Sequence, residues 1–242
     1  MALLEKFETD FGVIQVIRSK RDGTVSYYQN GCFHSQANGQ GTSVCAYVHV
    51  IQEIIRQAHA RHVLIIGCAG GTLATMLRRL HCRVTVVDIN PVAFAIARRY
   101  FRLPQDVRCI RRDGIAYLRN SRRKYDAVVV DVFSSDNGIP QSFVTESFFR
   151  KVGRVLSPAG LMIMNVITAD DNDRRADIIA RQAQLSGMDI TLFDWPGEKD
   201  RNSLIVSGMT QHMHIPSGHE PAWIKADLKG LIRRKPKKRA FG

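Results

Sequence analysis

The sequence predicts an α/β protein with a mostly parallel sheet, helices on both faces, and a small N-terminal β-hairpin region before it. Between about residues 46 and 168, apolar segments of strand length alternate with segments whose apolar residues recur at helical spacing. Two short β-type segments around an Asp-Gly turn precede this region. With 242 residues, 45% of them hydrophobic and 24% charged, the chain suits one α/β domain with a small appendage.

Residues 1–45 form the predicted hairpin region. Residues 11–17 alternate between apolar and polar side chains, Asp22-Gly23 supplies a turn, and residues 24–28 are β-branched and aromatic. Residues 38–43 are typical of a glycine-rich loop. The first residues, MALLEKFETDFG, carry early acids and no apolar core, so no signal peptide is predicted.

Residues 46–210 form the predicted main domain. Helices are expected where apolar side chains recur every three or four positions, at about residues 47–58, 73–80, 91–100, 145–156 and 172–186. Strands are expected in the apolar segments at 63–66, 84–88, 107–110, 127–131, 161–167, 190–193 and 203–207. Right-handed crossovers bring the carboxyl ends of parallel strands to one edge of such a sheet.

Residues 211–242 form a basic C-terminal tail that we expect to be flexible. The tail contains the basic run RRKPKKR, on a chain with a net charge of +13. One interpretation is contact with nucleic acid or another polyanion. The other is a solvated tail, which we favour because no aromatic residues alternate with the basic ones.

Several classes of protein are not expected. No apolar segment approaches the roughly 18 residues that a membrane-spanning helix needs, so no membrane contact is predicted. The five cysteines are odd in number and contain no C-x-x-C pair, which predicts free thiols in a reducing, cytoplasmic compartment. The histidines show no ligand spacing, so no metal is predicted.

The strongest local signal is a glycine-rich turn between the strand at 63–66 and the helix after it. The turn consists of Gly67, Cys68, Ala69, Gly70 and Gly71. Glycines at such a place let the backbone approach a ligand closely. The lysine of a Walker loop is absent and the G-x-G-x-x-G pattern is not met, so a tight turn without a ligand is the alternative.

Acidic residues follow the next three strands. Asp88, followed by Ile89, ends the second strand roughly 20 residues after the glycine turn, where a carboxylate accepts hydrogen bonds from ribose hydroxyls. Asp113, followed by Gly114, comes after the third strand, within reach of an adenine amino group; its alternative role is to cap a helix. Asp131 ends the fourth strand, where reacting groups of such sheets lie. We therefore expect a nucleoside site at this edge.

The segments VLIIGCAGGTL, VTVVDINP, RRDGIAYL, YDAVVVDVFSSDNGIP, FVTESFF and LSPAGLMIMNV resemble the spermidine synthase family. The resemblance extends over about residues 10–207 and includes the N-terminal hairpin. The family's members are polyamine aminopropyltransferases built on the class I methyltransferase fold. The resemblance therefore implies a Rossmann-like, seven-stranded, mostly parallel sheet.

The resemblance also implies a reaction: transfer of the aminopropyl group of decarboxylated S-adenosylmethionine to a small-molecule amine, by a homodimer. Residues 67–72 would line the sulfonium end of the nucleoside, Asp88 would hold the ribose, and Asp113 the adenine. Asp131 matches the family's catalytic carboxylate, and Asp136 lies near its second, amine-binding acid. Both reactants are cations, so a locally acidic pocket suits this chemistry.

Several residues that would bind the acceptor differ from those of the family. Ala69 stands where the family's glycine loop carries an Asp, His34 replaces a Gln, and Trp195-Pro196 replaces Tyr-Pro. This pattern resembles the spermidine-synthase-like branch, whose substrates need not be putrescine. The residues expected to contact the acceptor are His34, Gln36, Tyr47, Asp136 and Trp195.

Two other functions stay open. A methyltransferase would use intact S-adenosylmethionine, whose carboxylate would meet no repelling acid at Ala69, and the many arginines would favour an acidic acceptor. A catalytically idle nucleoside-binding or scaffold protein is the third hypothesis. Asp131 discriminates, because an idle protein has little need of an acid at the end of that strand.

Overall fold

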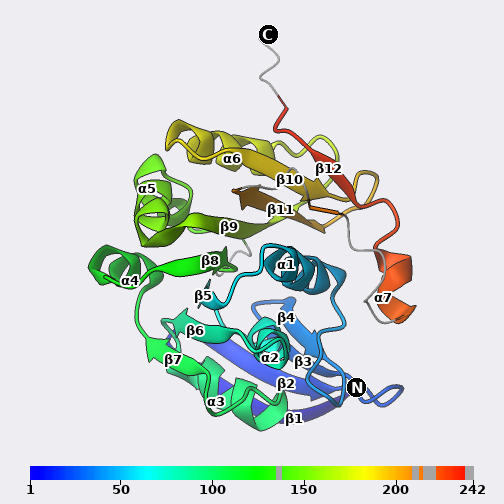
Figure 1. Ribbon diagram of the computed structural model, residues 1–242. Coiled ribbons are helices and arrows are strands. Elements are labelled where there is room, and N and C mark those ends of the chain that lie inside the picture. Colours follow the sequence, from blue (N-terminus) through cyan, green and yellow to red (C-terminus); the bar gives the residue numbers. More distant parts are fainter. Residues whose placement is uncertain (135–137, 209–212, 215–221, 238–242) are drawn as a thin grey trace.

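The computed structural model describes residues 1–134, 138–208, 213–214 and 222–237. It confirms the predicted α/β class, because a mostly parallel sheet lies between helices and a smaller antiparallel sheet lies below it in Figure 1. Asp136, a predicted acceptor-binding acid, lies outside the described residues. None of the described helices is long and apolar enough to cross a membrane.

The N-terminal sheet has four antiparallel strands in chain order: β1 (Ala2–Thr9), β2 (Gly12–Arg18), β3 (Val25–Gln29) and β4 (Cys32–Ala37). The predicted hairpin is β2 and β3, and the sequence did not predict β1 and β4. Ile14, Val16, Val25 and Tyr27 are buried in the same apolar cluster as residues of the main domain. This shared cluster fixes the small sheet against the large one.

The large sheet has eight strands in the order β12-β10-β11-β9-β8-β5-β6-β7, one strand more than expected. Their bounds are β5 (His62–Ile66), β6 (Arg83–Asp88), β7 (Arg108–Arg111), β8 (Tyr125–Val130), β9 (Leu156–Thr168), β10 (Ile190–Asp194), β11 (Arg201–Ser207) and β12 (Ile232–Arg234). Strands β5 to β9 pair in parallel, whereas β11 is antiparallel to both β9 and β10. The carboxyl ends of the parallel strands therefore share one edge.

Helices follow most of these strands. Their bounds are α1 (Ala46–Gln57), α2 (Thr72–Arg79), α3 (Pro91–Tyr100), α4 (Gly114–Asn120), the short 3₁₀ helix η1 (Gln141–Phe143), α5 (Glu146–Val155), α6 (Arg175–Leu185) and α7 (Ala222–Asp227). Asn90 caps α3 before Pro91, because its side chain accepts the N–H of Val92 at 3.1 Å.

The central strand β8 shows why the apolar segments form a sheet covered on both sides. Ala127 and Val129 belong to one buried cluster, whereas Val128 and Val130 belong to the cluster on the other face. Alternate side chains of a strand point to opposite faces, so a continuous apolar segment is buried only between two helical layers. Asp131 follows directly at the end of this buried strand.

The C-terminal tail is predicted to be flexible, but residues 222–227 of it form α7 and residues 232–234 form β12. Strand β12 pairs with β10. Arg234 explains this packing, because its guanidinium lies 2.8 Å from Asp177 Oδ1 and 3.0 Å from Asp194 Oδ2. Both carboxylates are almost fully buried. Part of the basic charge is thus paired inside the protein.

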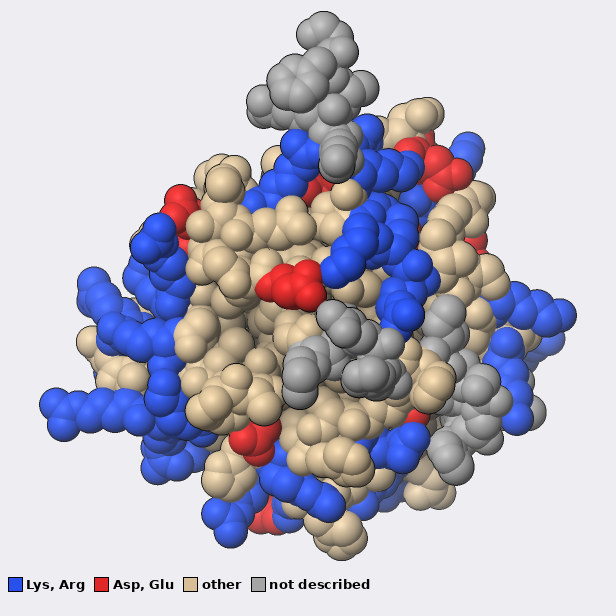
Figure 2. All heavy atoms as spheres, turned by 45° about the horizontal axis from the view of Figure 1, so that its top comes forward, with Lys and Arg blue, Asp and Glu red and all other residues tan. Residues whose placement is uncertain are grey.

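Lysine and arginine side chains cover much of the face in Figure 2, with few acidic side chains between them. Lys235 pairs with Asp189 at the surface, and Arg181 donates to the Lys237 carbonyl. These contacts draw the described part of the basic segment back onto the fold. Contact of the tail with a polyanion stays a prediction.

We expect Arg234→Ala to lower the free energy of unfolding by about 3 kcal/mol, because it leaves two buried carboxylates short of a partner. Chemical denaturation measures this loss. The matched control is Lys235→Ala, which removes an exposed ion pair and should cost less than about 1 kcal/mol. Equal losses in the two variants would contradict the assigned role of Arg234.

Stability should also fall in acid through Asp194. Burial by itself raises the pKa of this carboxyl, but hydrogen bonds from Arg201, Ser203 and Arg234 outweigh it and hold the pKa at about 2. The folded pKa lies below the unfolded one, so the stabilisation is complete above about pH 4 and is lost as the pH falls towards 2. Denaturation curves between pH 6 and 2 should show a smaller acid loss in Arg234→Ala.

Candidate functional site

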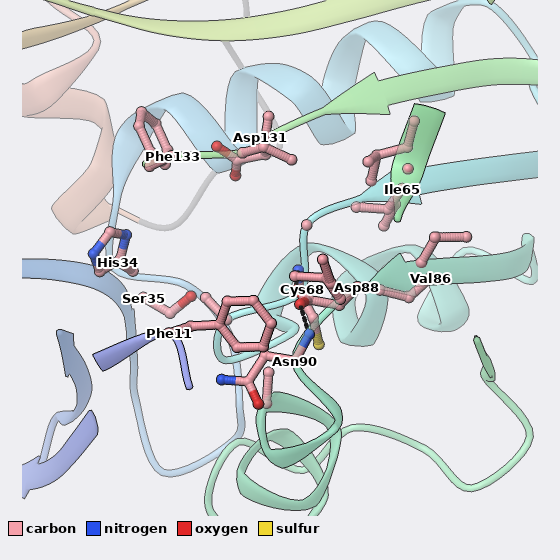
Figure 3. A pocket seen from close by; sticks show the side chains of 18 of the residues that line it. Phe11, His34, Ser35, Ile65, Cys68, Val86, Asp88, Asn90, Asp131 and Phe133 are labelled. Atoms are coloured by element: carbon pink, nitrogen blue, oxygen red, sulfur yellow. Dashed lines mark hydrogen bonds between the residues drawn. The ribbon is translucent and has the colours of Figure 1, made fainter. Parts of the chain in front are cut away.

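A cavity of about 710 Å³ lies at the carboxyl ends of β5, β6 and β8, a size typical of small-molecule sites. The main sheet and the loops after its strands form one side of it. The turns of the N-terminal sheet form the other side and contribute Phe11, Gln29 and Asn30 (Figure 3). The small sheet thus supplies one wall of the site.

The glycine turn brings two strand ends together. Gly67 has a φ of +99°, and a Cβ added to it would lie 1.9 Å from the Asp131 carbonyl oxygen. A side chain at this position is therefore excluded by both backbone conformation and space. Gly71 and Ala69 also have positive φ angles, +65° and +42°, so the whole turn is tightly wound. Gly67, Cys68, Ala69 and Gly71 line the cavity.

Gly70 is not among the residues that line the cavity. Its N–H donates to Ser35 Oγ at 3.0 Å, and a Cβ there would lie 2.7 Å from the Ser35 Cβ. The predicted contact of Gly70 with a ligand is therefore not supported by its position. Gly70 instead joins the turn to β4 of the N-terminal sheet.

Asp88, at the end of β6, holds the glycine turn from the other side. Its Oδ2 accepts the Cys68 N–H at 2.7 Å and its Oδ1 accepts the Asn90 N–H at 2.8 Å (Figure 3). Burial raises the pKa of Asp88, and these backbone donors oppose the rise. Asp88 lines the cavity, and Ile89 beside it exposes 48% of its surface at the same cavity.

Asp113 has the capping role considered for it, and its contact with adenine stays a prediction. Its side chain caps α4 by accepting the Ala116 N–H at 2.7 Å, and the residue also lines the cavity. Gly114 lines the cavity next to it, and a Cβ there would lie 2.4 Å from Ile66 Cγ2. The glycine therefore lets α4 start close against β5.

Asp131 lies at the end of β8, with both carboxylate oxygens engaged. Oδ2 accepts from the Tyr47 hydroxyl at 3.3 Å, and Oδ1 accepts from Asn165 Nδ2 at 2.9 Å. Burial raises the pKa of Asp131, whereas the hydrogen bonds from Asn165 and Tyr47 lower it. Asn165 is in turn held by Asn202, whose amide donates to it at 3.0 Å.

An aromatic wall stands on the same side of the cavity as Asp131 (Figure 3). The ring centroids of His34 and Phe133 are 5.9 Å apart, and those of His34 and Tyr27 are 6.3 Å apart. His34 Nε2 lies 3.1 Å from the Gln29 carbonyl oxygen and donates to it. Burial lowers the pKa of His34, which favours a neutral imidazole near neutral pH.

Two predicted acceptor-binding residues lie outside the cavity. Gln36 donates to Ser26 Oγ at 3.2 Å within the N-terminal sheet. Trp195 is 4% exposed, and its indole N–H donates to the Asp227 carbonyl at 2.9 Å, which links the end of β10 to α7. The resemblance to the family predicted that Trp195 contacts the acceptor, but its ring packs in the core.

The charge of the cavity differs from that of the chain. Among the described residues that line it there are four aspartates: Asp10, Asp88, Asp113 and Asp131. The basic side chains there are Arg112 and His34. A protein of net charge +13 thus has a locally acidic pocket, which suits a cationic ligand.

The sequence did not single out Phe11, Phe133 or the pair Asn165 and Asn202. Phe11 is 40% exposed at the cavity, and an exposed aromatic residue in a turn is a weak signal by itself. The sequence signal at Asn165 is clearer, since this residue interrupts the otherwise apolar segment at 161–166. A polar residue inside a buried strand requires a hydrogen-bond partner.

Comparison with known protein families identifies the family of this chain. The family model described as "Spermine/spermidine synthase domain" matches residues 44–174, more than half of the chain. The chain belongs to this family. The match includes the glycine turn, Asp88, Asp113 and Asp131, so the resemblance found in the sequence is confirmed.

Individual relatives have two kinds of name. The chain is 36% identical over 115 residues to a polyamine aminopropyltransferase of Chromobacterium violaceum, which is 46% of this chain and 44% of that protein. It is 31% identical over 126 residues to an "eEF1A lysine and N-terminal methyltransferase homolog" of Drosophila melanogaster, which is 47% of this chain and 19% of that protein. The chain thus spans less than half the length of either relative.

A solved structure supports the fold over the whole chain. A probable spermidine synthase from Corynebacterium glutamicum superposes with a TM-score of 0.74 at 19% identity, covering 100% of this chain and 99% of that one. At this identity the likeness concerns the fold. The N-terminal sheet and the Rossmann-like sheet are both included in it.

We expect Asp88→Ala to weaken the binding of methylthioadenosine by about 1–3 kcal/mol, because ribose hydroxyls and the Cys68 N–H lose their acceptor. Isothermal titration calorimetry measures the change. Asp106→Ala, which removes an exposed carboxylate paired with Arg78, is the control and should bind normally. An unchanged affinity in Asp88→Ala would remove the ribose assignment.

Proposed function

We propose that this protein transfers an aminopropyl group from decarboxylated S-adenosylmethionine to an amine, as in polyamine biosynthesis. The observation that best supports this proposal is the position of the Asp131 carboxylate. It lies beside the glycine turn in an acidic cavity and accepts hydrogen bonds from uncharged side chains. Family membership and the name of the Chromobacterium relative support the same reaction.

The proposed reaction is a direct substitution. The nitrogen lone pair of a neutral acceptor amine attacks the carbon bonded to the positive sulfur, and the carbon–sulfur bond breaks with both electrons going to sulfur. The first products are methylthioadenosine and an alkylated ammonium. Asp131 holds the incoming amine in line and then accepts one proton from this ammonium, which leaves a neutral alkylated amine and a protonated Asp131.

The charge of the cavity favours the decarboxylated donor over S-adenosylmethionine itself. An aminopropyl group ends in an ammonium, whereas a methionine tail also carries a carboxylate. The described lining offers four carboxylates but only Arg112 as a guanidinium. Neutral His34 adds no fixed positive charge. A carboxylate would therefore enter an acidic site with few partners.

A methyltransferase is the second candidate. Ala69 supports it, because the turn lacks the acid that would repel the carboxylate of intact S-adenosylmethionine. The name of the Drosophila relative supports it as well. A non-catalytic nucleoside-binding protein is disfavoured by the cost of keeping a half-buried carboxylate without a cationic partner at Asp131. The homodimer, the cytoplasmic location and the tail's polyanion contact stay predictions.

Calorimetry with three ligands distinguishes the candidates. Decarboxylated S-adenosylmethionine should bind at least about tenfold more tightly than S-adenosylmethionine, a difference of roughly 1.4 kcal/mol. Methylthioadenosine should bind as the shared product. Tighter binding of intact S-adenosylmethionine would overturn aminopropyl transfer in favour of methylation. No binding of any of the three would contradict both.

Asp131→Asn should abolish release of methylthioadenosine from the decarboxylated donor and a panel of primary amines, while nucleoside affinity stays within about threefold. Chromatography of the product and calorimetry measure the two effects. The matched control is Asp126→Asn at the opposite end of β8, where the carboxylate accepts backbone N–H groups of Arg61 and His62. Turnover retained in Asp131→Asn would refute the catalytic role.

A further inference from the structure

Asn165 has a buried side-chain amide whose nitrogen and oxygen are both hydrogen-bonded. It lies within β9, is 1% exposed, and sits in an otherwise apolar segment. Its Nδ2 donates to Asp131 Oδ1 at 2.9 Å, and its Oδ1 accepts from Asn202 Nδ2 at 3.0 Å. Burying an amide is unfavourable unless such bonds are made, so both bonds are needed at this place.

The sheet register brings the two asparagines together. Strands β9 and β11 are antiparallel, with Asn165 opposite Leu204 and Asn202 opposite Ile167. Residues at such diagonal positions project from the same face of a sheet and are neighbours. A chain of hydrogen bonds therefore runs from β11 through β9 to the carboxylate at the end of β8.

This chain of bonds has a direction. Because Asn202 donates to the carbonyl of Asn165, the amide nitrogen of Asn165 must point to Asp131. The reverse orientation would set a carbonyl oxygen against a carboxylate, and only a protonated Asp131 could donate a hydrogen bond to that oxygen. The bond from Asn202 and the carboxylate of Asp131 thus favour the same orientation of Asn165, with its amide nitrogen towards the site.

We propose that Asn165 and Asn202 are positioning residues that orient the Asp131 carboxylate and keep it as a proton acceptor facing the acceptor amine. The inference rests on the proposed function for the identity of that amine. The orientation itself concerns groups of this chain alone.

The neutrality of the donors is the physical reason for such an arrangement. Tyr47 of α1 binds the other oxygen of Asp131, and burial raises the Tyr47 pKa, so it remains an uncharged donor. Among the described residues, the other titratable groups near Asp131 are His34 of β4, whose pKa burial lowers, and Cys45 before α1, whose thiol pKa burial raises. An arginine would cancel the charge of Asp131, whereas the Asn165 amide and the Tyr47 phenol leave it for a cationic substrate.

The test follows the Asp131 carboxyl directly by ¹³C NMR of the free, full-length protein labelled at aspartate, with Asp131→Asn assigning the resonance. Asn165→Ala should raise the titration midpoint by about one pH unit, because one donor to the ionised form is lost. Asn202→Ala should raise it by about half as much, since Asn165 stays but its amide is free to turn.

Ser203→Ala is the matched control. Ser203 is fully buried on β11 next to Asn202 and bonds to Asp194 and Thr168, so its loss weakens the same strand without touching the chain to Asp131. Its Asp131 midpoint should equal that of the wild type. An unchanged midpoint in both asparagine variants, or an equal shift in Ser203→Ala, would overturn the proposal.

Kinetics supply a second readout. In Asn202→Ala, kcat should fall on the order of tenfold with an unchanged KM for the nucleoside, and the acidic limb of the kcat profile should move to higher pH. A fall in kcat without movement of that limb would reduce Asn202 to a structural role. Failure of the wild type to turn over would refute the proposed function, yet the NMR titration would still decide the positioning role.

Discussion

The site depends on one close approach of backbones. The Asp131 N–H donates to the Ile66 carbonyl and the Gly67 N–H donates to the Val87 carbonyl, each at 2.9 Å, so the ends of β5, β6 and β8 are joined at a single point. The Asp131 carbonyl then occupies the place where Gly67 would carry a side chain. Only a glycine in a left-handed conformation permits this geometry, and it sets Asp131 beside the turn that Asp88 anchors.

The distribution of charge follows from the same framework. Two of the strands that meet at the glycine turn bring an aspartate, Asp88 of β6 and Asp131 after β8. Together with Asp10 and Asp113 they make the cavity acidic on a strongly basic chain. At the β12 end of the large sheet, buried Arg201 and half-buried Arg234 pair with Asp194. Positive charge is thus used to hold β10, β11 and β12 together, while the aspartates of the cavity stay without arginine partners among the described contacts.

The sequence predicted the main sheet well because buried parallel strands are continuous apolar segments. It missed β4, whose residues CFHSQA are mostly polar and follow no such pattern, and β12, whose basic residues become a strand through Asp177 and Asp194 far away in the chain. It predicted Asp88, Asp113 and Asp131 from their positions at strand ends, since those positions converge in any fold of this class. Side-chain directions are set by packing, so it could not place Trp195 in the core.

Asp88 and Asp131 show how two carboxylates in similar positions acquire different roles. Asp88 accepts backbone N–H groups from the glycine turn and from Asn90, so its charge helps to build the turn. Within the described part of the chain, Asp131 accepts from the side chains of Tyr47 and Asn165, which leaves its charge for a ligand. Because side-chain donors can be exchanged more easily than backbone N–H groups, the proton affinity of Asp131 is the property that substitutions in β9 and β11 can adjust without rebuilding the fold.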